Sequence, residues 1–268
     1  MKRDFSITLI IVVLAVIFSF TLPIHADSNS SWLTQHLQSA FSIGQGILFI
    51  SAGFFTFQGI FRIKTLAGII GKALKVFSIG LALLGLGFIQ VPFMNAYNLW
   101  TSFYFTSNIY YLIYALGAIL MLLGLLIAGI QFAKKVAISV ILVVILSILF
   151  RISLSYIPQN MIALLGRSLA NYKVTLTLDT IFVGVTLLIT IISILITNSF
   201  GSSKVGRIFR LITLGFIFIL IGVFMTVHLN IIDFTKQWYY LNGIYYSTFF
   251  IGSFFLTLFG LRLKYFRI

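Results

Sequence analysis

The sequence predicts an all-α integral membrane protein. Seven transmembrane helices form two parallel three-helix repeats joined by a linker helix, and a signal peptide precedes them. Composition indicates the class, because 60% of the 268 residues are hydrophobic and 8% are charged, whereas soluble domains carry about 25% charged residues. The apolar residues also fall into runs of about 20, the length that crosses a bilayer. An internal repeat indicates the arrangement.

The second half of the chain repeats the first at a constant offset of 135 residues. The segment Gly71-Lys72-x-x-Lys75 recurs as Gly206-Arg207-x-x-Arg210. Further matches at this offset join Gly80 to Gly215, Gly87 to Gly222, Asn95 to Asn230 and Tyr110 to Tyr245. These matches carry more weight than matches between apolar residues, because apolar residues dominate the whole chain. We therefore predict that each half supplies the same membrane unit, in the same orientation.

Residues 1–26 have the composition of a signal peptide. Lys2 and Arg3 form a basic start, Phe5 to Phe20 are apolar, and a cut is expected after Ala26. The apolar stretch exceeds the roughly 7–15 residues usual for such a segment, so an uncleaved anchor is the alternative. Residues 27–38 then form a short outer segment.

The remaining chain divides into two repeats and a linker. Spans are predicted near residues 39–61, 74–94, 109–132, 136–157, 174–197, 208–229 and 243–263. The first three lie in one repeat, residues 39–133, and the last three in the second, residues 174–268. The fourth span has no match at the offset of 135 and belongs to the linker, residues 134–173. The end of this linker has the spacing of a short amphipathic helix lying in the outer interface.

Orientation follows from the basic residues, which concentrate in alternate short loops. Cytoplasmic loops carry the excess of Lys and Arg, so the mature N-terminus is placed outside the plasma membrane and the C-terminus in the cytoplasm. The formal net charge of +14 then faces anionic lipid headgroups of the bilayer, which explains it without nucleic acid.

This arrangement of three, one and three helices resembles that of the SWEET sugar transporters and the microbial rhodopsins. The resemblance covers the seven spans as architecture alone. SWEET-type proteins have prolines in corresponding helices of both halves, whereas Pro92 corresponds here to Val227. Rhodopsins attach retinal to a lysine in the middle of the last helix, whereas Lys264 lies at its cytoplasmic end. The resemblance therefore implies a fold and no retinal.

Two ionisable residues fall inside predicted spans, at matching depth on consecutive helices. At 1.5 Å per residue, Arg151 and Asp179 lie roughly 8–9 Å below the outer ends of their helices. An unpaired charge at this depth costs several kcal/mol, so the two side chains are expected to pair. The pair either joins two helices as a buried contact or borders a cavity that opens to the outer face between the repeats.

The residues that recur in both halves have structural and ligand-binding interpretations. Asn95 and Asn230 lie near the outer surface and are expected to end helices, because Asn tolerates the left-handed conformation. Tyr110 and Tyr245 anchor the outer interface or stack on a ligand. The basic residues Lys72, Lys75, Arg207 and Arg210 contact cytoplasmic lipid headgroups, or an acidic segment of a partner. The glycines at 80, 87, 215 and 222 let helices pack closely.

Signatures of enzymes are absent from the sequence. It contains no His-Glu-x-x-His, no Gly-rich phosphate loop, no Gly-x-Ser-x-Gly, no Cys and no Glu. We therefore expect no catalysis, no cofactor and no bound metal. One function is a sensor or accessory subunit that binds an apolar or amphipathic ligand or a membrane partner from outside, with a separate membrane protein carrying the output. The alternative is a small-solute transporter in which the two repeats rock against each other.

Overall fold

The structure is a computed structural model that describes residues 1–22, 32–62, 68–97, 109–130, 133–155, 169–231 and 238–266. Within these ranges the chain is helical, apart from short turns, and contains no strand. The helices are α1 (Lys2–Ser19), α2 (Trp32–Arg62), α3 (Ile69–Ala96), α5 (Ile109–Ala128), α6 (Ala133–Ser155), α8 (Leu169–Phe200), α9 (Lys204–Ile231) and α10 (Trp238–Lys264).

The protein is a multi-pass helical membrane protein. Five helices in the described part of the chain are long and apolar enough to cross a bilayer: the stretches are His36–Phe61, Ile69–Met94, Thr180–Phe200, Lys204–Phe224 and Tyr246–Lys264. A shorter apolar stretch, Leu112–Ala128, lies in α5. Each predicted span overlaps one helix, and five of the seven fall in these five long helices. The predicted spans 109–132 and 136–157 overlap α5 and α6, which are not among the five. The predicted signal segment forms α1. Most of the predicted interfacial helix lies outside the described residues.

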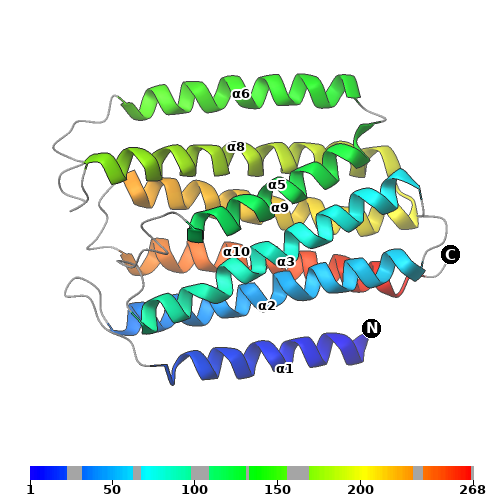
Figure 1. Cartoon of the computed structure of the whole chain (residues 1–268). Helices are drawn as coiled ribbons and strands as arrows, with labels where there is room; N and C mark the ends of the chain where they lie inside the picture. The colour runs from blue at the N-terminus through cyan, green and yellow to red at the C-terminus, as the bar shows by residue number, and fades with distance from the viewer. Residues whose placement is uncertain are drawn as a thin grey trace.

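The helices are arranged as a ring with one additional helix on each side (Figure 1). In the first half, α3 packs between α2 and α5, and in the second half α9 packs between α8 and α10. Two further contacts join the halves, α2 with α10 and α5 with α8. Outside this ring, α1 lies against α2 and α6 lies against α8, at opposite edges of the bundle. Both chain ends lie at the same end of the bundle.

Glycines bring α3 onto α5 and α9 onto α10 at matched positions. A Cβ atom built on Gly80 would lie 2.7 Å from the carbonyl oxygen of Gly117. One built on Gly215 would lie 3.0 Å from the carbonyl oxygen of Gly252. Both residues of the second pair are 135 positions after those of the first. In lipid, where no hydrophobic force drives helices together, such close backbone approach stabilises helix pairing.

A second pair of glycines accepts aromatic rings at equivalent places. A Cβ on Gly87 would lie 3.1 Å from the ring of Tyr114, and one on Gly222 would lie 2.4 Å from the ring of Phe249. These two rings are again 135 residues apart. The packing role predicted for the four repeated glycines is therefore confirmed.

An aromatic core fills the space between the halves. Phe77 and Phe216 make an edge-to-face contact with ring centroids 5.9 Å apart. Phe88 contacts Phe49 at 5.5 Å and Phe249 at 5.5 Å. All of these side chains are buried. Edge-to-face and offset ring pairs add about 0.5–1.5 kcal/mol each beyond their burial, so ring packing helps to hold the two halves together.

Candidate functional site: a lateral groove between α6 and α8

A groove with a volume of about 450 Å³ lies between α6 and α8. Its floor includes Val143 and Leu188, which are buried. Its rim includes Val144, Ile148 and Ile181, whose side chains are about half exposed in the isolated protein. Because α6 stands at the edge of the bundle, this rim lies on the outside of the protein.

The composition of α6 explains why the groove is apolar. The helix is hydrophobic on every side, and its main packing partner in the described chain is α8. The two helices approach closely where a Cβ built on Gly184 would lie 2.7 Å from Oγ of Ser147. Ser147 and Thr180 are the polar residues of the lining. The site thus offers hydrocarbon walls, with hydroxyl groups as the hydrogen-bonding side chains.

The predicted ion pair lies beside this groove in the sequence. Arg151 belongs to α6 and Asp179 to α8. The residues that follow them, Ile152 and Thr180, both line the groove. The two charged side chains lie outside the described residues, so their pairing remains a prediction.

The other predicted ligand residues lie at helix ends whose side chains are also outside the described set. These are Asn95 in α3, Asn230 in α9, Tyr110 in α5 and Tyr245 in α10. The helix-ending role expected of Asn95 is wrong, because α3 continues to Ala96 and its C-cap is Tyr97. The helix continues through Asn95 because its neighbours Met94 and Ala96 are buried and keep the last turn packed.

The repeated basic residues lie exposed at the starts of α3 and α9. Lys72, Lys75, Arg207 and Arg210 all face outward there. The ammonium group of Lys75 lies 4.9 Å from the centroid of the Phe61 ring. Arg210 donates from Nη2 to the carbonyl oxygen of Gly201 at 3.4 Å. Neither contact neutralises the positive charge, so these side chains are available for anionic groups.

Sequence reasoning missed a set of polar groups buried inside the bundle. Gln45 is fully buried and donates from Nε2 to the carbonyl oxygen of Tyr246 at 2.9 Å. Thr257 donates to the carbonyl oxygen of Leu48 at 2.8 Å and thereby also joins α10 to α2. The signal was a three-residue spacing of polar side chains in α2, at His36, Ser39, Ser42 and Gln45, all of which are buried.

Most buried hydroxyl groups are satisfied locally. Thr186, Thr190 and Ser193 donate to carbonyl oxygens three or four residues earlier in α8. Within the described chain, Oε1 of Gln45 and Oγ1 of Thr56 lack a hydrogen-bond partner. The interior is therefore less purely apolar than composition indicates, but its hydroxyl groups mainly serve helix packing.

The described residues contain no group of His, Cys, Asp and Glu able to hold a metal ion. Comparison with protein-family models, with curated proteins and with solved structures finds no match to this chain. The groove is therefore interpreted from its own geometry and chemistry.

Proposed function

We propose that this chain is a non-catalytic membrane protein that binds an apolar or amphipathic molecule from the outer side, as a sensor or accessory subunit. The groove between α6 and α8 is the observation that carries the proposal. Its volume falls within the range of about 300–1,000 Å³ that is typical of ligand sites. Because its walls are hydrocarbon and its rim faces lipid, the ligand class is a molecule with a hydrocarbon chain.

The polar part of such a ligand would lie toward the outer end of the groove. Basic residues of alternate loops place the starts of α3, α6 and α9 in the cytoplasm, so the end near Ile152 and Thr180 faces outward. Thr180 offers a hydroxyl group there, and Arg151 and Asp179 precede the two lining residues. A head group with hydrogen-bonding or charged atoms would suit this end.

Output would pass to a separate membrane protein. The faces of α6 turned away from the groove expose Ile138, Leu142, Ile145 and Leu149. A partner helix could contact this surface and respond to a shift of α6 when the groove fills. The proposed membrane is the plasma membrane, with the C-terminus in the cytoplasm.

The test uses a palmitate carrying a photoreactive diazirine as probe. The protein is placed in phosphatidylcholine nanodiscs and illuminated, and labelled peptides are quantified by mass spectrometry. Val144→Trp fills the rim of the groove, whereas Leu142→Trp adds the same ring to the opposite face of α6, at similar exposure. A loss of about 1.4 kcal/mol in binding free energy corresponds to a tenfold increase in Kd. We expect groove labelling to fall by about that factor in Val144→Trp alone.

Equal labelling of wild type, Val144→Trp and Leu142→Trp would contradict the proposal, because it would show that lipid contacts the whole of α6 without preference. Circular dichroism and gel filtration check that both variants fold.

A small-solute transporter is the second candidate, and the matched glycine contacts of the two halves favour it. Equivalent three-helix blocks are the parts that rock in transporters with parallel repeats. The aromatic contact between Phe77 and Phe216 would have to separate during such a motion. Ligand binding to the lateral groove requires no such separation.

A further inference from the structure

We infer that α1 stays in the folded protein as the counterpart of α6, so that the chain is a duplication of a four-helix unit. The uncleaved form of the first helix is thus favoured over a removable signal peptide. This inference deepens the proposed function, because it explains why the groove exists beside α6 and not beside α1.

The offset of 135 residues covers all four helices of each half. Shifted by 135, the range of α3 becomes 204–231, which is the range of α9 to the residue. The range of α1 becomes 137–154 and falls inside α6 (Ala133–Ser155). The range of α5 falls inside α10, and that of α2 overlaps α8. The helix that seemed to lack a counterpart in the sequence therefore has one in α1.

Residues at matched positions of α1 and α6 are also similar in burial and in their contacts with the next helix. Thr8 and Val143 are 135 residues apart, and both are buried, at 5% and 4% exposure. Val12 and Ser147 are also 135 apart, and each meets a glycine of the next helix. Cγ1 of Val12 lies 3.6 Å from a Cβ built on Gly44, and Ser147 meets Gly184. The matched residues of both outer helices thus face the first helix of their own half, α2 or α8, although the two glycines that they meet are not at matched positions.

An ion pair at the basic end of the bundle ties α1 to α10. The carboxylate of Asp4 pairs with the ammonium group of Lys264 and accepts a hydrogen bond from the Tyr265 hydroxyl at 2.9 Å. The side chains of Asp4 and Lys264 are only 12% and 11% exposed. Lys264 also lies 5.0 Å from the centroid of the Phe55 ring.

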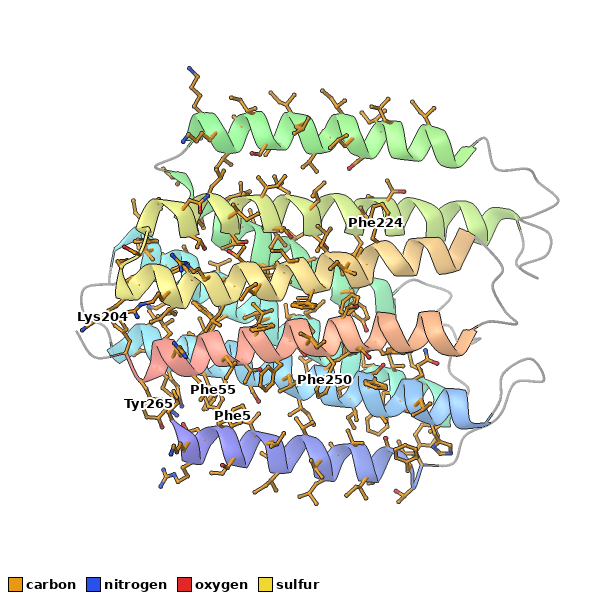
Figure 2. All side chains as sticks on the ribbon, turned by 180° about the vertical axis from the view of Figure 1, so that it is seen from behind. Phe5, Phe55, Lys204, Phe224, Phe250 and Tyr265 are labelled. Carbon is orange, nitrogen blue, oxygen red and sulfur yellow. The ribbon has the colours of Figure 1, made fainter. Side chains whose placement is uncertain are left out.

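Next to this ion pair, Phe5 of α1 contacts Phe254 of α10 with centroids 5.8 Å apart. Figure 2 shows Phe5, Phe55 and Tyr265 gathered at this end of the bundle. Together these residues form what we call the clasp: Asp4, Phe5, Phe254, Lys264 and Tyr265.

None of the clasp residues is repeated at the corresponding positions of α6 and α5. At the offset of 135, Asp4 corresponds to Ser139 and Lys264 to Gly129. Phe5 corresponds to Val140, which lines the groove, and Phe254 to Ile119, which is 46% exposed. The ion pair and the ring contact that join α1 to α10 thus have no equivalent between α6 and α5, and we attribute the groove between α6 and α8 to this loss.

The experiment uses the absence of native cysteine. Phe5→Cys and Phe254→Cys are introduced together into the full-length chain, which is expressed in membranes and oxidised with copper phenanthroline. Disulfide formation is measured by mass spectrometry of peptides. The pair Ile10→Cys with Phe254→Cys is the control, because Ile10 is 57% exposed on α1. We expect cross-linking of the first pair at least about tenfold above the control, since effective concentrations of neighbouring groups reach the millimolar range.

The intact mass of the purified wild-type protein is the second measurement, and it does not depend on the cysteine variants folding. A mass that includes residues 1–22 supports the inference. A mature chain that begins after residue 22 overturns it, as does equal cross-linking of both cysteine pairs. Probe labelling of the groove is scored separately, so loss of α1 with intact labelling would overturn this inference and leave the proposed function standing.

Discussion

The two outer helices, α1 and α6, differ in how many neighbours hold them. The three atoms nearest to a Cβ built on Gly44 come from Val12 and Val16 of α1 and from Phe250 of α10, so three helices meet there. The three atoms nearest to a Cβ on Gly184 come from α6 alone. Equivalent helices can therefore form one closed and one open edge when a few surrounding side chains differ.

The helix contacts next to the outer helices differ in the same way: α2 packs closely on α10 beside α1, and α8 packs more loosely on α5 beside α6. Close backbone approaches at Gly59 and Gly260 bring α2 onto α10. At the offset of 135, these positions are Ile194 in α8 and Leu125 in α5. Bulkier side chains keep helices farther apart in lipid, and α8 indeed packs less extensively on α5 than α2 does on α10. The open edge beside α6 thus reflects both the missing clasp and the looser packing of α8 on α5.

The largest effect is expected from filling the two glycine crossings. Gly44→Leu would push against Phe250 and two valines of α1, and such overpacking costs about 1–3 kcal/mol. With roughly 2–4 °C per kcal/mol, the midpoint of thermal unfolding should fall by about 5 °C or more. Gly184→Leu meets the movable Ser147 side chain next to a groove, so its midpoint should fall by about 2 °C or less. An equal fall in the thermal midpoint of Gly44→Leu and Gly184→Leu would mean that α1 and α6 are packed equally tightly.

Breaking the ion pair of the clasp should have the next largest effect. Asp4→Asn leaves Lys264 without a charged partner in a site that is about 11% exposed. An exposed ion pair contributes about 0–1 kcal/mol to the free energy of unfolding, whereas removing one partner of a buried pair lowers it by about 3–5 kcal/mol. Because this pair is partly buried, we expect Asp4→Asn to lower the free energy of unfolding by about 1–2 kcal/mol. The thermal midpoint should fall by about 3–5 °C. Lys135→Gln on exposed α6 is the control and should change little.

The pH dependence gives a second readout of the same contact. Lys264 lowers the pKa of the Asp4 carboxyl, with the Tyr265 hydroxyl adding to this and partial burial opposing it. Asp4 lies at the end of α1, outside the apolar stretch. The stabilisation is therefore present above the unfolded pKa of about 3.9 and is lost as pH falls through the lower folded value. The difference between wild type and Asp4→Asn should be constant from about pH 7 to 5 and shrink below about pH 4. A constant difference at every pH would contradict this assignment.

The helices could be predicted from the sequence because each is a long apolar run, and the glycine contacts because glycine is conspicuous in a repeat. Pairing of Gly80 with Gly117, and of Gly215 with Gly252, follows the same offset in the structure. What the sequence did not reveal is the match between α1 and α6. Apolar residues at matched positions are not informative, and the distinctive residues Asp4 and Phe5 have changed to Ser139 and Val140.

The groove itself could not be predicted either, because it arises from a missing contact. Sequence patterns indicate residues that are present, whereas the groove depends on Gly129 and Ile119 standing where the clasp has Lys264 and Phe254. The nearest prediction was a cavity beside Arg151 and Asp179 that opens between the repeats, whereas the groove lies between the linker helix α6 and α8. It used the depth of two charges, and its residues adjoin the lining at Ile152 and Thr180.

The smallest expected effect comes from making α1 resemble α6 at one position. Phe5→Val introduces the residue found at the matched position 140 and removes the contact with Phe254. Loss of one ring pair costs about 0.5–1.5 kcal/mol, so the thermal midpoint should fall by about 2–3 °C. The diazirine palmitate should then begin to label α1 and α10 near this site, where wild type is protected by the clasp. Ile10→Val, a change of one methyl group on the exposed face of α1, should produce neither effect. If Phe5→Val loses stability without new labelling, the ring pair supports α1 but does not exclude lipid, and the missing ring contact would not explain the open groove beside α6.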